Sequence, residues 1–301
     1  MLTHTVTPAE AGRSLRDLLR NALFLSDGAI RRAKWENRLL RNGAPGRLRD
    51  VCAAGDVIAF LPEAERPAYR PSPLDLPLDI PWQDERLLII DKPAPLASQS
   101  GKGHPDDSLE NALFAHLGCP ADFVYRPVNR LDKGTSGLMA VALDAAEQYR
   151  LQRLLHTPAF RREYLAVTEG IPPRDSGTVD APIAKAPEAT VRRIVAPEGR
   201  PSVTHYRVLA VCAQNKRALV RLTLETGRTH QIRVHLASLG CPVFGDFLYG
   251  REDPALPGRF ALHSAFLAFP DRNGETVTVT SPLPAALQAL LEPGEGPLPL
   301  G

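Results

Sequence analysis

One loop of the sequence has the composition of a site that presents a reactive carboxylate. Residues 126–142 read RPVNRLDKGTSGLMAVA, which places Asp132 between Arg130 and Lys133 and ahead of a Gly-Thr-Ser-Gly turn. Turn-prone residues beside a charged group are typical of a loop that displays the charge, and the apolar run that follows predicts a strand that anchors the loop. A carboxylate held in this way can act as a nucleophile or a general base. The alternative is a structural turn in which Asp132 accepts hydrogen bonds from backbone amides.

A second segment, residues 222–250, gathers polar and cationic side chains around another glycine turn. It reads LTLETGRTHQIRVHLASLGCPVFGDFLYG, and we expect a strand to end at its Glu-Thr-Gly. A short helical stretch is predicted to follow, with the polar residues Arg228, Thr229, His230, Gln231, Arg233 and His235. Residues four apart on a helix share a face, as Thr229 and Arg233 would. The two histidines are five apart and no third ligand is near, so the pattern does not indicate a metal site.

Composition and charge indicate an ordinary globular protein. The 301 residues carry a net charge of +2, with 44% hydrophobic and 23% charged residues, so nucleic-acid binding has to come from local patches. The four cysteines are far apart, which indicates neither a disulfide framework nor a zinc site and is typical of a reducing cytoplasm. The N-terminus lacks an apolar signal core, and no run approaches the ~18 apolar residues that cross a bilayer. We therefore expect a cytoplasmic protein that does not bind a membrane.

The first 61 residues are expected to form a small domain of their own. Four leucines between positions 15 and 23 form a helical stripe, Ser26 is a candidate N-cap for a second helix, and a turn-rich stretch ends in a strand at 56–60. The second helix and its following turn are rich in basic residues, namely Arg31, Arg32, Lys34, Arg38, Arg41, Arg47 and Arg49. Such a run is either a solvated face or a phosphate-binding face. The domain resembles the α-L RNA-binding domain of ribosomal-protein type in the segments LSDGAIRRA, LLRNG and GDVIAF. This resemblance favours RNA binding by Arg31, Arg32, Lys34 and Arg41.

The rest of the chain divides into a linker and a larger domain. Residues 62–81 hold six prolines, a density that breaks helices and interior strands and predicts an extended linker. From Trp82 onward the pattern changes to α+β. Apolar or alternating runs predict strands at 87–93, 162–170, 205–212, 218–226 and 276–282, and helical periodicity predicts helices at 108–117 and 144–157. The segments around Asp132 and Arg233 would then belong to one domain, 82–301.

Two segments together resemble the RluA family of RNA pseudouridine synthases. They are PVNRLDKGTSGLMAVA and ETGRTHQIRVHLASLGCPVFGDFLYG. RREYLAVTEG resembles that family's tyrosine strand and LLIIDKPAPLAS its lysine-proline strand, so the resemblance covers most of residues 82–270. Two positions depart from it, because Asn129 stands where the family often has His and Pro95 where it often has Gly. The resemblance implies the α+β pseudouridine synthase fold, with a mixed, largely antiparallel central sheet and flanking helices.

The resemblance also implies a reaction and the residues that perform it. The enzyme would detach uracil from its ribose, turn the base and rejoin it through carbon, which requires no redox change and no cofactor. Asp132 would be the reacting carboxylate, as a nucleophile on sugar or base or as a general base. Arg233 would be its cationic partner, with Arg228 the weaker candidate, and Tyr164 would stack on the target base. Because that base must be flipped out of the RNA, Arg130 is placed to fill the vacated space or hold a phosphate. Thr229 and Gln231 join Arg130 and Arg228 as expected RNA-binding residues.

The partner and the rival functions remain alternatives. The N-terminal domain favours large-subunit ribosomal RNA as the substrate, with transfer RNA second, and the sequence shows no interface pattern, so we expect a monomer. A non-catalytic RNA-binding protein that keeps the fold would have lost the carboxylate or the tyrosine, whereas Asp132 and Tyr164 are both present. A hydrolase using Asp132 and a histidine would need a nucleophile–base–orienter set, and no spacing indicates one.

Overall fold

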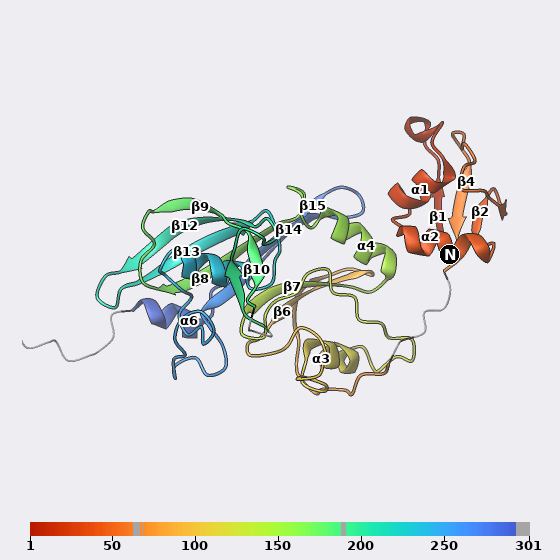
Figure 1. Cartoon of the computed structure of the whole chain (residues 1–301). Helices are drawn as coiled ribbons and strands as arrows, with labels where there is room; N and C mark the ends of the chain where they lie inside the picture. Colours follow the sequence, from red (N-terminus) through yellow and green to blue (C-terminus); the bar gives the residue numbers. More distant parts are fainter. Residues whose placement is uncertain (63–66, 68, 188–190, 293–301) are drawn as a thin grey trace, which may run out of the picture.

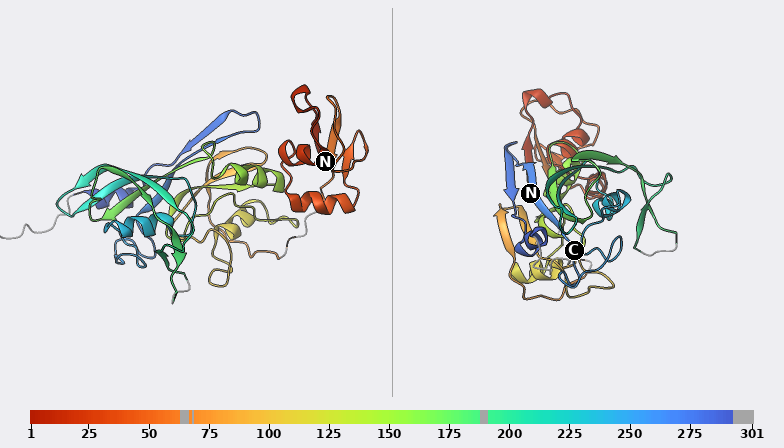
Figure 2. Two further views of the ribbon diagram at one scale, coloured as in Figure 1. Left: turned by 45° about the horizontal axis from the view of Figure 1, so that its top comes forward. Right: turned by 90° about the vertical axis from the view of Figure 1, so that its left-hand side faces the viewer.

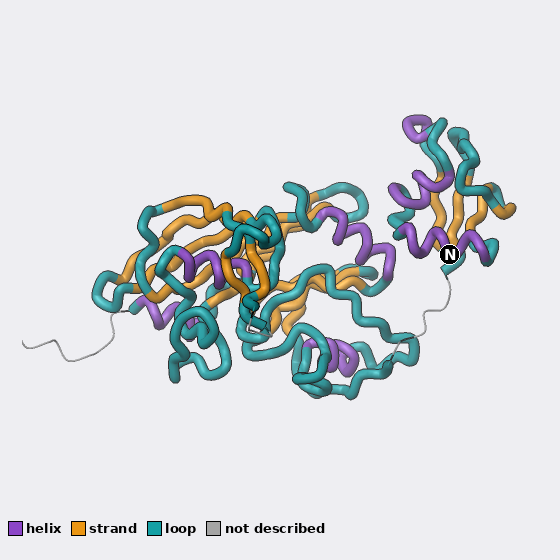
Figure 3. Tube along the Cα trace, in the orientation of Figure 1, coloured by secondary structure: helices purple, strands orange, loops and turns teal. Residues whose placement is uncertain are grey.

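The computed structural model describes residues 1–62, 67, 69–187 and 191–292, which form a small N-terminal domain and a larger domain (Figure 1). The left view of Figure 2 also shows the small domain at one end of the molecule. Strands predominate in the larger domain, with short helices beside them (Figure 3). Among the described helices, none combines the length and the apolar character that a bilayer-crossing segment requires.

The N-terminal domain packs two helices against a four-stranded sheet with the order β1-β4-β2-β3. Its elements are β1 (Leu2–Thr5), η1 (Pro8–Glu10), α1 (Leu15–Asn21), α2 (Asp27–Trp35), β2 (Leu39–Arg41), β3 (Ala44–Pro45) and β4 (Val57–Phe60). The predicted leucine stripe is buried in its core. Ser26 caps α2 as predicted, because its hydroxyl accepts a hydrogen bond from the Ala29 amide at 3.2 Å. Strand β1, which pairs with β4, had no clear signal in the sequence.

The larger domain is built on a nine-stranded sheet with the order β5-β6-β7-β14-β8-β13-β12-β9, and β15 pairs with β14. These strands are β5 (Asp79–Gln83), β6 (Leu87–Lys92), β7 (Ser136–Ala142), β8 (Arg161–Glu169), β9 (Ser176–Asp180), β12 (Val203–Cys212), β13 (Arg217–Leu224), β14 (Leu262–Pro270) and β15 (Thr276–Thr280). The pairing of β7 with β14 is parallel and the other pairings are antiparallel. The predicted mixed, largely antiparallel α+β fold is therefore confirmed.

The remaining elements surround this sheet. They are α3 (Leu109–His116), α4 (Ala145–Leu154), the hairpin strands β10 (Ile183–Lys185) and β11 (Arg193–Val195), α5 (Gln231–Ser238), α6 (Ala285–Gln288) and η2 (Ala289–Leu291). Helices α3 and α4 lie on opposite sides of the β6–β7 half of the sheet (Figure 1). In β6, Leu88 and Ile90 pack on the α3 side, whereas Leu87 and Ile89 pack on the α4 side. A strand buried on both faces reads as a continuous apolar run, which explains the sequence LLII.

Gly137 sets the contact between β7 and β14 next to the Asp132 loop. Its φ of 107° lies in the region that favours glycine. A Cβ at this position would be 2.3 Å from the carbonyl oxygen of Ser264, which pairs with Gly137 across the two strands. Gly137, the last residue of the Gly-Thr-Ser-Gly turn after Asp132, thus lets β7 and β14 approach each other.

The predicted linker, 62–81, is too long at its C-terminal end. Strand β5 begins at Asp79 and pairs with β6 at the edge of the sheet. Upstream of it, Leu74 packs against the core, and its amide donates to the carbonyl oxygen of Asn111 at 3.2 Å. Leucines that alternate with polar residues and prolines match an edge strand and its approach, where proline is tolerated. The larger domain therefore starts before Trp82, while residues 63–66 and 68 of the predicted linker lie outside the described residues.

Candidate active site

Asp132 lies in a tightly held loop that leads into β7. Its carbonyl oxygen accepts a hydrogen bond from the Thr135 amide at 3.0 Å, which closes the predicted turn. Just before it, Leu131 is fixed by Ser98, whose hydroxyl donates to the Leu131 carbonyl at 2.6 Å and accepts from its amide at 3.2 Å. The Asp132 side chain is 28% exposed and contacts basic side chains, and in the described residues no turn amide donates to it. The geometry therefore favours a displayed carboxylate over a structural turn.

A buried lysine supports this loop from below. Lys92 Nζ donates to the carbonyl oxygens of Leu96 at 2.7 Å and Pro93 at 3.0 Å, and more distantly to that of Lys133 at 3.5 Å. Burial lowers the pKa of Lys92 to about 7, and the negative charge of Asp132 opposes this shift. Lys92 thereby joins the turn after β6 to the loop that carries Asp132.

The cationic partner of Asp132 is Arg233 on α5. Arg233 Nη1 donates to Asp132 Oδ2 at 2.9 Å, and its Nε and Nη2 donate to the two carboxylate oxygens of Asp246 at 2.6 and 2.8 Å. The guanidinium also lies 4.1 Å from the ring centre of Phe260. Burial lowers the pKa of Arg233, but the bonds to Asp246 and the charge of Asp132 outweigh it, so the net shift is upward. Arg233 is thus a fixed positive charge that orients Asp132.

His230 is a second basic neighbour of Asp132. It sits just before α5 with φ 60° and ψ 17°, a left-handed conformation that is uncommon outside glycine and often marks a functional site. Its Nε2 lies 3.8 Å from Asp132 Oδ2, and its Nδ1 lies 2.8 Å from the Tyr249 hydroxyl. That hydroxyl also accepts from the Arg193 amide at 2.8 Å, and we expect it to direct its own proton to Nδ1. Burial lowers the pKa of His230, and the negative charge of Asp132 opposes this shift.

Tyr164 supplies the aromatic wall of the pocket. It lies in β8 between Leu222 of β13 and Ser264 of β14, and it is 5% exposed. It lines a small pocket together with Asp132, Arg233 and other residues of the two polar segments. Burial raises the pKa of Tyr164, whereas the charge of Arg162 opposes the rise. The phenol therefore keeps its proton at neutral pH.

The other predicted binding residues differ in their surroundings. Arg130 is exposed and Thr229 is exposed at the loop before α5, and Arg228 lines the pocket. Gln231 is 3% exposed and uses both amide atoms within the protein, since it accepts from Thr226 and Arg228 and donates to Val203 and Thr204. Gln231 therefore positions the loop and has no hydrogen-bonding capacity left for RNA.

Two details of the predicted site need correction. Helix α5 begins at Gln231, so Arg228, Thr229 and His230 precede it and do not share a helical face with Arg233. The basic neighbours of Asp132 in the sequence do not pair with it, because Arg130 contacts Gln99 at 3.4 Å and Lys133 contacts His104 at 3.5 Å. The compensating charge comes from a residue that is distant in sequence, which adjacency along the chain could not reveal.

The N-terminal basic residues form a surface patch on α2. Arg31, Arg32 and Lys34 are exposed, whereas Arg41 lies in β2 and pairs with Asp56 at 2.7 Å. Trp35, which the sequence analysis did not select, is 76% exposed, and Lys34 Nζ lies 5.1 Å from the centre of its ring. An exposed aromatic side chain beside basic residues is typical of a surface that stacks on bases and contacts phosphates.

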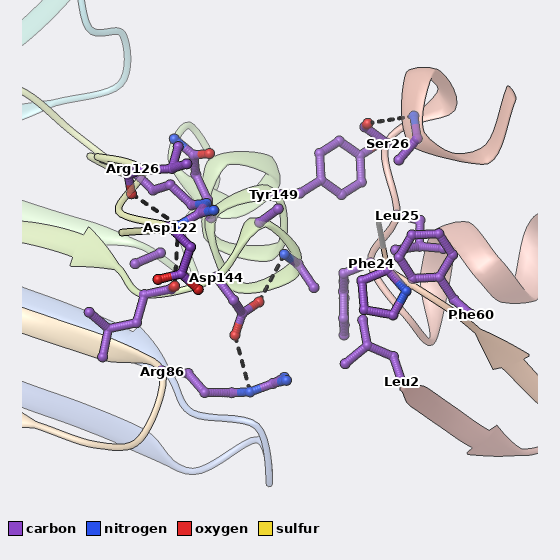
Figure 4. Close-up of a pocket in the computed structure, with 18 of the residues that line it drawn as sticks. Leu2, Phe24, Leu25, Ser26, Phe60, Arg86, Asp122, Arg126, Asp144 and Tyr149 are labelled. Carbon is purple, nitrogen blue, oxygen red and sulfur yellow. Dashed lines mark hydrogen bonds and ion pairs between the residues drawn. The ribbon is translucent and has the colours of Figure 1, made fainter. Parts of the chain in front are cut away.

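A larger hollow of about 970 Å³ lies between the two domains (Figure 4). The labelled residues that line it include Leu2, Phe24, Phe60, Arg86, Asp144 and Tyr149. Arg86 and Asp144 form an ion pair at 3.1 Å. The hollow reaches Ala142 at the far end of β7, and a strand of this length spans roughly 20 Å. It is therefore separate from the Asp132 pocket.

Other clusters do not provide a rival site. Ser136 and Ser281 lie 3.0 Å from the two nitrogens of His263, and Ser281 donates to Asp91, which superficially matches a hydrolase set. Ser136, His263 and Ser281 are buried, so no substrate can reach them. Among the described residues, no group of histidine, cysteine and acidic side chains is arranged to hold a metal ion.

Comparison with known proteins agrees with this geometry. Residues 86–238 match the family model described as RNA pseudouridylate synthase. The chain is 40% identical over 254 residues to the "Ribosomal large subunit pseudouridine synthase D" of Escherichia coli (strain K12), covering 83% of this chain and 76% of that one. The protein of the same name from Xanthomonas campestris pv. campestris is 36% identical over 96% of this chain and 92% of its own. The solved structure "Human RNA Pseudouridylate Synthase Domain Containing 1" superposes with a TM-score of 0.56 and 27% identity, over 68% of this chain and 83% of that one.

The fold and the family match define an isomerase that acts on RNA. More specifically, the chain belongs to the RNA pseudouridylate synthase family and is an RNA pseudouridine synthase. The RluA-type resemblance read from the two polar segments is confirmed.

Proposed function

We propose that this protein converts specific uridines of large-subunit ribosomal RNA to pseudouridine. The relatives from Escherichia coli and Xanthomonas campestris carry that substrate in their names. The observation that carries the proposal is Asp132 held by Arg233 at 2.9 Å in a pocket whose wall is Tyr164. Transfer RNA is the alternative substrate. A ribosomal substrate would place the protein in the cytoplasm, and we propose that it acts there as a monomer.

The reaction exchanges one bond for another. The bond between ribose C1′ and uracil N1 breaks, the base turns, and a bond forms between C1′ and uracil C5. A hydrogen leaves C5 and N1 gains one, so atoms and electrons balance without a cofactor. We propose that Asp132 is the group that reacts with the nucleoside, as a nucleophile or a base. Arg233 positions this carboxylate through its bond to Oδ2 at 2.9 Å, and His230 Nε2 lies 3.8 Å from the same oxygen.

Tyr164 and Arg130 are proposed to handle the base. The target uridine leaves the RNA stack to reach Asp132, which costs a few kcal/mol of unstacking. Stacking on the Tyr164 ring replaces part of that loss, since stacking of a base on an aromatic side chain contributes about 1–3 kcal/mol. Arg130 is exposed and lines the pocket, which supports the proposal that it enters the vacated position.

Residues 1–61 are proposed to form an α-L RNA-binding domain that adds affinity. Arg31, Arg32 and Lys34 present exposed charge on one helix beside Trp35. Arg41 contributes less, because Asp56 already neutralises it. A patch of this kind attracts RNA through phosphate contacts, with an affinity that falls as salt rises.

Mapping of pseudouridines tests the proposed substrate directly. Ribosomal and transfer RNA would be purified from cells with and without the gene and mapped with a carbodiimide that labels pseudouridine. We expect specific sites to disappear from large-subunit ribosomal RNA and to return when the wild-type gene is restored. Sites that disappear only from transfer RNA would establish the alternative substrate.

A further inference from the structure

Three basic side chains from separate elements meet near the catalytic pocket. They are His156 just after α4, Arg162 in β8 and Arg228 in the loop after β13. A Cβ at Gly227 would lie 3.1 Å from His156 Cε1 and 3.5 Å from Arg162 Nη1, so the bare glycine lets the two side chains approach this loop. Burial, followed by the charges of Arg162 and Arg228, lowers the pKa of His156. The three groups are therefore close enough to repel one another electrostatically.

Arg162 is unusual because it is buried without a carboxylate. It is 6% exposed, its Nη2 donates to the Leu155 carbonyl at 3.1 Å, and its Nε has no hydrogen-bond partner in the described part of the chain. The other buried arginines in that part, Arg150 and Arg233, each donate to a carboxylate. Burial of an unpaired charge is costly, and a guanidinium does not lose its proton to avoid that cost.

No carboxylate compensates this cluster within the described residues. Glu163 follows Arg162 in sequence, but neighbouring residues of a strand point to opposite faces, and Glu163 contacts Arg161 and Arg221. Arg228 Nε donates to the Pro201 carbonyl at 3.2 Å, and its terminal amino groups have no partner among the described side chains. A concentration of positive charge that the protein leaves unbalanced is suited to an anion from outside.

The cluster adjoins the pocket that holds Asp132 and Tyr164. Arg162 and Tyr164 are two residues apart on β8, so their side chains leave the strand on the same face. The charge of Arg162 acts on the Tyr164 phenol, and Arg228 lines the pocket that holds Asp132 and Tyr164. A uridine that enters this pocket brings its flanking phosphates to the rim.

We propose that His156, Arg162 and Arg228 form a binding subsite for an RNA phosphate that flanks the flipped nucleotide. His156 and Arg228 contact the phosphate at the surface, and the buried charge of Arg162 attracts it from beneath. The proposal rests on the function proposed above and adds to it a phosphate contact that fixes the position of the nucleotide. The arginine that weakens the folded protein is retained because its charge is balanced when RNA binds.

The variant His156→Glu tests this subsite at an exposed position. Its carboxylate would balance Arg162, so we expect a higher Tm than that of the wild type. The same carboxylate would repel the RNA phosphate, so we expect an affinity about tenfold lower and a salt dependence whose slope is smaller by about 0.7, the value for one single-stranded phosphate contact. The probe is a synthetic RNA hairpin that the wild-type protein modifies.

A matched control and a modified probe separate the possible results. Ala286→Glu adds a carboxylate at an exposed position of α6, and it should leave affinity and salt slope unchanged. A methylphosphonate next to the target uridine should weaken binding to the wild type but not weaken it further in His156→Glu or Arg162→Met. If His156→Glu matches Ala286→Glu in affinity and slope, no phosphate binds there and the subsite is refuted. If the wild type modifies no uridine in any RNA, the proposed function fails instead.

Discussion

Asp246, Arg233 and Asp132 form a series of ion pairs that leads from the core to the pocket. Because the two carboxylates differ in burial, we predict different consequences when each one is removed. Asp246 is fully buried, Arg233 is 3% exposed, and Asp132 at the pocket is 28% exposed. We compare Asp246→Asn, which removes the buried anchor of Arg233, with Asp132→Asn, which removes the group proposed to react. The first should mainly reduce stability, and the second should mainly abolish activity.

The magnitudes follow from what each variant leaves behind. Removal of one partner of a buried ion pair costs about 3–5 kcal/mol, because the remaining charge is unpaired. In Asp246→Asn the guanidinium keeps its bond to Asp132 and can still donate to the remaining amide oxygen, so we expect a loss near the lower limit, about 3 kcal/mol. In Asp132→Asn, Arg233 keeps both bonds to Asp246 and solvent screens the change, so we expect a loss of about 1 kcal/mol or less.

Urea unfolding of the two variants, followed by circular dichroism, measures these losses. Asp106→Asn is the control, since Asp106 is exposed, and it should change stability by less than about 0.5 kcal/mol. Equal losses for Asp246→Asn and Asp132→Asn, or a smaller loss for Asp246→Asn, would refute the view that Asp246 anchors Arg233 from the core.

Three other features of the structure lead to further tests. Burial gives Lys92 a pKa of about 7, well below the value of about 10.4 expected in the unfolded chain. Between these pH values the unfolded chain binds more protons than the folded protein. The free energy of unfolding should therefore rise from pH 7 to pH 9. Lys92→Met should lack that rise in urea unfolding, and an identical rise in the variant would contradict the assignment. Tyr249→Phe removes the hydroxyl expected to donate to His230 Nδ1. The imidazole should then protonate at a higher pH in NMR titration, and the acid limb of the activity profile should shift to higher pH with it. Unchanged curves would show that the hydroxyl does not set the tautomer. Changing Arg31, Arg32 and Lys34 of α2 to glutamine should weaken RNA binding and flatten its salt dependence in filter-binding assays. Arg41→Gln should have a smaller effect, because Asp56 pairs with Arg41. An unchanged salt slope would show that the three α2 residues form only a solvated face.

Local patterns in the sequence predicted many of the elements near the site. The apolar run LLII, the helix capped by Ser108 and the glycine turn after Asp132 each have a signal within a few residues, and each element is present. Strand β14 was missed although it lies at the centre of the sheet, because its sequence LHSAFLAFP lacks alternation and its short apolar run AFLAF does not by periodicity distinguish a buried strand from a helix segment. A strand buried by contacts on several sides takes its pattern from the tertiary structure.

The site was predicted in part, and its missing members share a cause. Asp132 and Arg233 are far apart in sequence, and their pairing came from a family resemblance that spans both segments, not from periodicity. Asp246 and Tyr249 stand in the same quoted segment, but their contacts with Arg233 and His230 depend on how the chain returns after α5. Gln231 was predicted to bind RNA, but its side chain bonds to Arg228 and Val203 and holds the loop before α5.

The most direct test of the account measures isomerisation itself. RNA carrying tritium at carbon five of uracil releases the label when pseudouridine forms, because the new bond to ribose replaces that hydrogen. The wild-type protein should release tritium from large-subunit ribosomal RNA, while Asp132→Asn should release none and still bind the RNA in filter assays. Release by Asp132→Asn at the wild-type rate would remove Asp132, and with it the carboxylate–arginine pair, from the mechanism.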